Sequence, residues 1–170
     1  SGATVNSAVL GVTAQRNQDN VTANIRRMTT PWTETGATWN DSDGAGTGDW
    51  ATGTFSASDY DNTDFGSFTP TTADVLYETN ISSLLSAWIE DGDPNYGLLL
   101  LASGTATDRQ ELYSREDAGL EPYIKLEYTA PNAGGDSTTS ISASPVLVSE
   151  TGSSIFVEMT ISADEADADV

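Results

Sequence analysis

Apolar and polar residues alternate in several short runs along the chain, which is the pattern of β-strands with one buried face. The clearest runs predict strands at residues 5–14, 20–28, 110–114 and 123–128. Residues 68–77 are also predicted to be extended. Residues 98–101 form a continuous apolar run between Gly97 and Gly104 that is too short for a helix, so they predict a fully buried central strand.

One segment has helical periodicity. Between positions 81 and 89, apolar residues recur at the i, i+3, i+4, i+7 and i+8 spacing of an amphipathic helix face, and Asn80 is placed to cap its N-terminus. The turn-forming residues 91–94 end the helix. Many short strands with one helix predict an all-β fold, namely a β-sandwich of jelly-roll type with one short amphipathic helix and a C-terminal strand extension.

Two segments lack a clear periodicity. Residues 35–64 are rich in Gly, Asp, Asn and Thr over a length typical of a functional loop or an ordered ion-bound loop. Residues 130–140 have the composition of a linker, so the sequence predicts a domain at residues 1–129 and a separate segment at residues 141–170. The latter ends in an acidic tail after two strand-like runs, residues 141–148 and 154–161. Because an isolated strand pair is marginally stable, these strands must pair with something else.

The charge balance and the residue types that are missing from the chain exclude several classes of partner and of catalytic site. The chain of 170 residues has 26 Asp plus Glu against 6 Lys plus Arg, and the net charge of −20 excludes nucleic acid and acidic membrane surfaces as partners. With no Cys and no His, carboxylates are the ordinary acid–base groups, and any metal would be a hard ion such as calcium. No apolar run reaches the roughly 18 residues of a membrane span, so no membrane insertion is expected. The Thr-rich, Lys-poor acidic composition predicts an extracellular or cell-surface location.

Two acidic clusters are candidate calcium sites. Asp91, Asp93 and Asn95 follow the D-x-D-x-N spacing, which can direct three oxygen atoms at one cation. The alternative is a helix-ending turn that uses Asp, Gly and Pro as turn formers. The second cluster comprises Asp59, Asp61 and Asp64, and its alternative is a solvated acidic loop.

Aromatic residues and glycosylation sequons suggest contact with carbohydrate. Trp50 and Tyr60 lie in the irregular segment and are the expected exposed faces for stacking on sugar rings, whereas Trp32 and Trp39 are expected in the core. The glycosylation sequon occurs at Asn20, Asn40 and Asn80, with a high chance rate in so Thr- and Ser-rich a chain.

The middle of the chain carries an ordered series of short motifs. They are Trp32-Thr33-Glu34, Ala37-Thr38-Trp39-Asn40, Ala73-Asp74-Val75, the helix of Trp88, Asn95-Tyr96-Gly97-Leu98, Tyr113-Ser114-Arg115-Glu116 and Pro122-Tyr123-Ile124-Lys125-Leu126. In this order they resemble the DNRLRE domain over about residues 5–128. The resemblance implies a jelly-roll of extracellular bacterial and archaeal proteins that is also placed among carbohydrate-binding modules.

The chain departs from that family at both ends. In the family, several strands precede the one that matches residues 5–14, so the resemblance leads us to expect a domain at residues 1–129 that is N-terminally incomplete. The C-terminal strands are additional, and the segment from Val146 to Ile161 resembles the opening of a Calx-beta or immunoglobulin-like repeat.

The two departures together suggest a function. A sandwich that lacks strands and carries unattached ones predicts a non-enzymatic structural subunit that donates C-terminal strands to a neighbouring copy, building a fibre or surface array. The expected donor residues are Val146, Val148, Ile155, Val157, Met159 and Ile161. One alternative is a carbohydrate-binding module of a larger secreted enzyme or adhesin, with glycans as partners. Another is a virion decoration or fibre protein.

Overall fold

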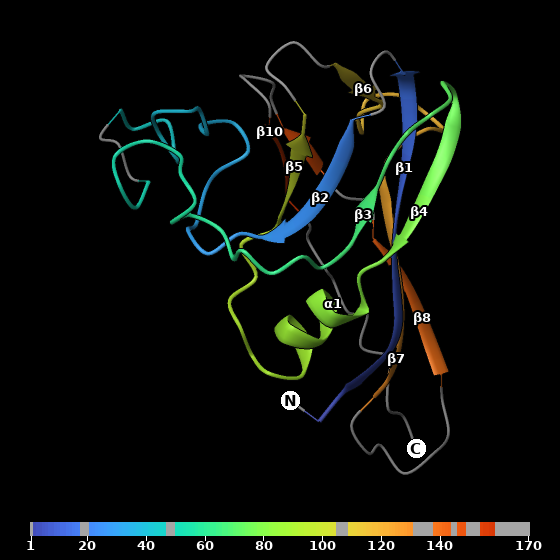
Figure 1. Cartoon of the computed structure of the whole chain (residues 1–170). Helices are drawn as coiled ribbons and strands as arrows, with labels where there is room; N and C mark the ends of the chain where they lie inside the picture. Colours follow the sequence, from blue (N-terminus) through green and yellow to red (C-terminus); the bar gives the residue numbers. More distant parts are fainter. Residues whose placement is uncertain are drawn as a thin grey trace.

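The computed structural model describes residues 2–17, 21–46, 50–104, 109–130, 138–143, 146–148 and 154–158 (Figure 1). In the last three of these ranges, only the backbone is described. The described residues form two antiparallel sheets and one short helix, which confirms the predicted all-β class.

Sheet A is built around the long first strand. Its order is β4 (Val75–Asn80), β1 (Thr4–Asn17), β7 (Tyr123–Thr129) and β8 (Thr138–Ala143), and β6 (Gln110–Leu112) pairs with the end of β1. The register runs from Thr4 opposite Thr129 to Gly11 opposite Tyr123, and every pairing is antiparallel. Sheet A therefore joins the two ends of the domain predicted from the sequence.

Sheet B contains the run of leucines. Its order is β3 (Ser67–Phe68), β2 (Thr22–Arg27), β5 (Leu98–Ser103), β10 (Ser154–Glu158) and β9 (Val146–Val148). The strand β5 is central, as the continuous apolar run predicts, with β2 on one side and β10 on the other.

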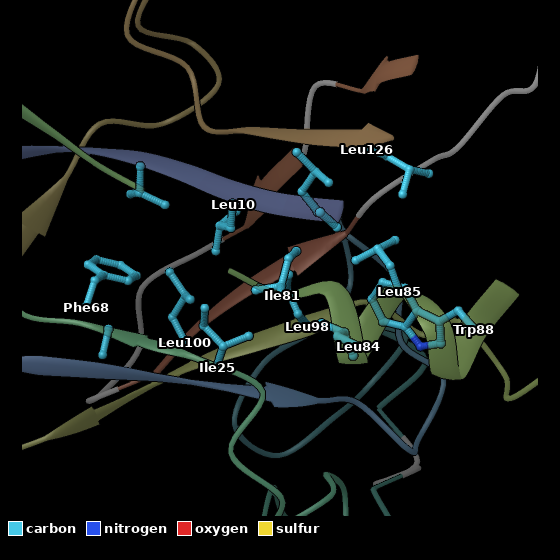
Figure 2. Close-up of a cluster of buried hydrophobic side chains, with 14 residues drawn as sticks. Leu10, Ile25, Phe68, Ile81, Leu84, Leu85, Trp88, Leu98, Leu100 and Leu126 are labelled. Carbon is cyan, nitrogen blue, oxygen red and sulfur yellow. The ribbon is translucent and has the colours of Figure 1, made fainter. Parts of the chain in front are cut away.

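The main hydrophobic cluster receives side chains from both sheets (Figure 2). On β1 the buried residues Ala8, Leu10 and Val12 alternate with residues of the opposite face, which is the period of a strand with one face in the core. Sheet B contributes Ile25 and Leu100 among others. The core thus lies between the two sheets.

The helix α1 (Ser82–Ile89) adds its apolar face to the same cluster. Its residues Leu84, Leu85 and Trp88 are buried beside side chains of the strands, as Figure 2 shows. The N-cap position is occupied by Ile81 and not by Asn80 as predicted, so the helix begins one residue later. Asn80 instead precedes the cap and accepts a hydrogen bond from the backbone N–H of Ser82 at 2.9 Å. No helix in the described part of the chain is long and apolar enough to cross a membrane.

The long segment between β2 and β3 covers the other face of sheet B, on the side away from sheet A (Figure 1). It forms a second cluster in which Trp50 and Phe55 pack with Leu99 of β5. Since Leu98 and Leu100 belong to the main cluster, β5 is buried on both faces. This explains why its sequence does not alternate.

Two element boundaries differ from the predictions. Residues 68–77 are not one strand, because Pro70 lacks a backbone donor and Asp74 adopts a left-handed φ of 58°, and β4 begins only at Val75. The strand β8 begins at Thr138, inside the range predicted as a linker, and the run predicted at 141–148 is divided between β8 and β9.

Candidate functional site

The strand β5 is one of two strands that receive the C-terminal segment. Its residues Leu98, Leu99 and Leu100 are 0%, 0% and 2% exposed. Along the edge opposite β2, β5 pairs with β10, from Leu98 opposite Val157 to Leu101 opposite Ser154. The C-terminal segment therefore converts a strand with a buried apolar run from an edge strand into an inner strand.

The strand β7 receives β8 in the other sheet. Ile124 and Leu126 of β7 are 1% and 4% exposed and belong to the main cluster. The register places them opposite Ala143 and Ile141 of β8. The segment after residue 137 thus adds β8 to sheet A, and β9 and β10 to sheet B, within the same chain.

Two of the predicted donor residues lie at core-facing register positions. Ile155 is opposite Leu100, and Val157 is opposite Leu98. Directly opposite residues of an antiparallel pair share one face of a sheet, so positions 155 and 157 share the face that meets the main cluster. The predicted donors Met159 and Ile161 lie outside the described residues.

The other two predicted donors fall on the opposite face. Val148 is opposite Phe156, and Val146 is opposite Glu158, whereas Leu147 is the register partner of Val157. The four predicted residues therefore do not form one apolar face. Alternation within each run cannot fix the register between two runs, and a shift of one residue exchanges the faces of a strand.

Trp50 is not the exposed sugar-stacking residue that the sequence suggests. It is 2% exposed, its indole N–H donates to the carbonyl of Thr38 at 2.9 Å, and its ring meets the edge of Phe55 with centroids 5.2 Å apart. Tyr60 is half-buried and stacks on the same Phe55 at 5.9 Å. These rings form the interior of the long segment, because an irregular segment of this length needs its own apolar cluster to be ordered.

Trp39 is the exposed tryptophan of this region. It is 44% exposed and packs against the edge of Phe55 with centroids 5.5 Å apart. Trp32, by contrast, is half-buried and donates its indole N–H to the carbonyl of Tyr96 at 2.7 Å. The expectation that Trp39 belongs to the core is therefore wrong, and the aromatic face open to a ligand is that of Trp39.

Asp59 is fully buried and binds the protein itself. Its carboxylate accepts hydrogen bonds from the hydroxyl of Thr30, the backbone N–H of Ala51, and both the N–H and the hydroxyl of Ser56, at 2.8 to 3.2 Å. These donors come from three parts of the long segment. Asp59 therefore holds the segment together and has no open side for a cation, which corrects its assignment as a calcium ligand.

Arg27 joins the two predicted acidic clusters. Its guanidinium pairs with Asp61 at 3.0 Å and with Asp93 through the other nitrogen. The backbone N–H of Thr63 and the charge of Arg27 lower the pKa of Asp61 below its usual value. The sequence did not point to Arg27, since its partners lie 34 and 66 residues away. Each cluster thus gives one carboxylate to the same arginine.

The remaining predicted calcium ligands do not converge. Asp64 lies 3.9 Å from Arg26, and the side-chain oxygen of Asn95 accepts the N–H of Gly97 at 3.0 Å, as in an Asx turn. Asp91 is exposed. In the part of the chain that the structure describes, no group of three or more acidic side chains is placed to hold a metal ion. Calcium binding stays a prediction.

Two of the three sequons are accessible. Asn40 is exposed in a tight turn next to Asp41, and Asn80 is exposed at the end of β4. Asn20 lies outside the described residues. The hydrogen bond to Ser82 uses the side-chain oxygen of Asn80, whereas glycosylation would modify its side-chain nitrogen.

Scans against protein-family models, curated proteins and solved structures return no match for the chain. The resemblance to the DNRLRE domain therefore rests on the motifs quoted above.

Proposed function

We propose that this protein is a non-enzymatic extracellular structural subunit that assembles by donating its C-terminal strands to a neighbouring copy. In this proposal, the two sheets form a β-sandwich of jelly-roll type that resembles the DNRLRE domain. The segment that carries β8, β9 and β10 completes the sandwich. In a single chain it completes its own sheets, and in a fibre or surface array it completes those of the next subunit.

The pairing of β10 with β5 supports this proposal best. Four leucines, residues 98–101, face β10 along an edge that would otherwise be open. The same main-chain hydrogen bonds form whether β10 belongs to the same chain or to another one, which is the basis of domain swapping and strand addition. Residues 130–137 have the composition of a linker, which suits pairing of the C-terminal strands either within the chain or with a neighbouring copy.

A cysteine pair can distinguish the two arrangements. The chain has no Cys, and Leu101 and Ser154 are opposite each other, so Leu101→Cys with Ser154→Cys brings two thiols within disulfide range. After the protein has assembled and been oxidised, we expect a ladder of covalent oligomers on a non-reducing gel.

The control for this experiment is Ser154→Cys alone, which lacks the receiving thiol and should give no ladder. If electron microscopy reveals fibres while the double variant yields only an internally bridged monomer, the strands are not exchanged, and the donor-strand proposal is wrong.

A second candidate function, a carbohydrate-binding module, is favoured by the exposure of Trp39. An exposed tryptophan in a segment rich in Thr and Asn suits the apolar face of a neutral sugar ring. This candidate does not require assembly, and it would leave the C-terminal strands paired within the chain.

Two tryptophan variants test the second candidate. We expect Trp39→Ala to weaken binding to a neutral glycan at least tenfold and to leave the melting temperature nearly unchanged, because the indole is 44% exposed. Trp50→Ala should instead destabilise the fold by about 3–5 kcal/mol, as for a buried aromatic residue. The measurements are glycan-array binding and thermal melting. Equal glycan binding by the native protein and Trp39→Ala would contradict this candidate.

A further inference from the structure

The outer face of sheet A is partly exposed in the described part of the chain: Leu76, Glu78 and Lys125 are exposed, whereas Thr13 and Gly11 are buried. The long segment covers sheet B on the far side (Figure 1). Register places Val9, Gly11 and Thr13 of β1 on this outer face, because the residues between them are buried in the core. Leu76, opposite Thr13, is 46% exposed, although it is a large apolar residue.

The centre of this face is a tyrosine held in a fixed position. The ring of Tyr123 lies over Gly11, where an added Cβ would come within 2.3 Å of the ring. Its phenol donates to Glu78 across β1 at 2.5 Å. That hydrogen bond, together with burial and the charge of Glu78, raises the pKa of Tyr123 to about 12. The ring is therefore a rigid aromatic platform, the kind of group that concentrates binding energy at protein interfaces.

One end of the face contains a hollow of about 370 Å³, which we call the acidic hollow. Its apolar lining residues include Leu76 and Leu120, which are 46% and 38% exposed, and its lining also includes the acidic residues Asp74 and Glu121. Asp74 accepts the phenol of Tyr113, and Glu121 accepts a backbone N–H, but neither has a cationic partner among the described residues. The hollow thus combines apolar walls with uncompensated negative charge.

The other end of the face contains the one lysine of the chain. Lys125 is opposite Val9, its side chain is 59% exposed, and its contact with Glu127 at 3.7 Å joins two exposed groups. Such a pair contributes little and leaves the ammonium group available. Val9 and Thr13 are four residues apart on β1, about 14 Å, and Gly11 is midway between them.

We propose that the outer face of sheet A binds the same face of a second copy about a two-fold axis that crosses the strands at Gly11, so that Lys125 of each copy enters the acidic hollow of the other. Rotation about this axis places each strand over the equivalent strand of the other copy but reverses its direction. The end of the face that contains Lys125 therefore lies over the acidic hollow of the other copy. The two Tyr123 rings then meet at the centre.

The chemistry of the hollow supports this occupant. The aliphatic stem of a lysine packs against leucine walls, and its ammonium group pairs with the carboxylates. Each ionic contact occurs twice because the interface is isologous. At physiological ionic strength, charges more than about 8 Å apart are largely screened, so the net charge of −20 on each copy does not prevent contact over this face.

Charge reversal provides the first test. We expect Lys125→Glu and Glu121→Lys, each alone, to weaken dimerisation about tenfold or more in sedimentation experiments, because each reversal acts at two places. An equimolar mixture of the two variants should recover the native affinity, since every reversed charge then faces an opposite one. Asp91→Lys makes the same change of charge as Glu121→Lys at an exposed site away from this face and should have no effect.

Cross-linking of thiols provides a test that does not depend on charge. Glu78 is opposite Gly11 on the proposed axis, so Glu78→Cys in one copy faces the same residue of the other across the gap of about 10 Å between packed sheets, and a bismaleimide of that length should link the two copies. Asp91→Cys should give no cross-linked dimer above the level expected from random collision. Melting curves confirm that each variant is folded.

The results also separate this interface from strand exchange. Dimers that persist in Lys125→Glu, a mixture without recovery, or equal cross-linking of Glu78→Cys and Asp91→Cys by the bismaleimide would overturn the proposal. A fibre that forms while Glu78→Cys stays unlinked would overturn it too, and would leave the exchange of C-terminal strands intact.

Discussion

Deletion of residues 129–170 should yield a protein that no longer unfolds cooperatively and that aggregates. Without β10 and β8, the strands β5 and β7 become edges, and Leu98, Leu100, Ile124 and Leu126 lose a neighbouring strand. Partial exposure of each side chain costs about 1–2 kcal/mol, against a total stability of about 5–15 kcal/mol for a domain. The loss is therefore comparable to the whole free energy of unfolding.

Thermal melting and light scattering measure this effect. A shorter deletion of residues 163–170 is the matched control, because it leaves β8, β9 and β10 in place, and it should melt like the native protein. A synthetic peptide of residues 138–158 added in trans should restore a cooperative transition. A truncated chain that remains monomeric with an unchanged melting temperature would rule out any essential role for the C-terminal strands.

The substitution Asp59→Ala should have the second largest effect. It removes the acceptor of four hydrogen bonds, from Thr30, Ala51 and twice from Ser56, at a side chain that is 0% exposed. Buried donors without an acceptor cost about 1–3 kcal/mol each, and since such losses are not additive, we expect a total of about 3–5 kcal/mol. Chemical denaturation followed by tryptophan fluorescence measures it, because Trp50 lies in the same segment.

Asp64→Ala is the matched control for this substitution. Asp64 is an exposed carboxylate of the same cluster, 3.9 Å from Arg26, and its removal should change the free energy of unfolding by less than about 1 kcal/mol. Equal stabilities of Asp59→Ala and Asp64→Ala would contradict the structural role assigned to Asp59. If calcium raises the stability of the native protein but not that of Asp59→Ala, the result would point back to a metal site at Asp59.

The spacing of apolar residues correctly predicted the elements whose buried face can be read from their own sequence. The helix and the central strand β5 follow from apolar spacing alone, and β1 and β7 follow from alternation. The long segment has no such period, so the sequence could not separate the buried Trp50 from the exposed Trp39. Their environments depend on which residues pack on Phe55, and that is decided by tertiary contacts.

The acidic clusters illustrate the same limit for the candidate site. Asp59, Asp61 and Asp64 lie within six residues of one another in a polar segment, yet one is a buried acceptor, one pairs with Arg27 and one is exposed. The environments of Asp59 and Asp61 depend in part on partners distant in sequence, Thr30 and Arg27, which a local pattern does not contain. The register of the C-terminal strands was missed for a related reason, since it is set by their partner β5.

The position of β1 at the centre of sheet A has a consequence for synthesis on the ribosome. Its first neighbour, β4, is complete at residue 80, but its second neighbour, β7, ends at residue 129. At roughly 5–20 residues per second, β1 waits about 2–10 s with one edge unpaired while the chain elongates. During that time it can be captured by a chaperone or by another nascent chain, so the rate of translation between β4 and β7 should influence the yield of folded protein.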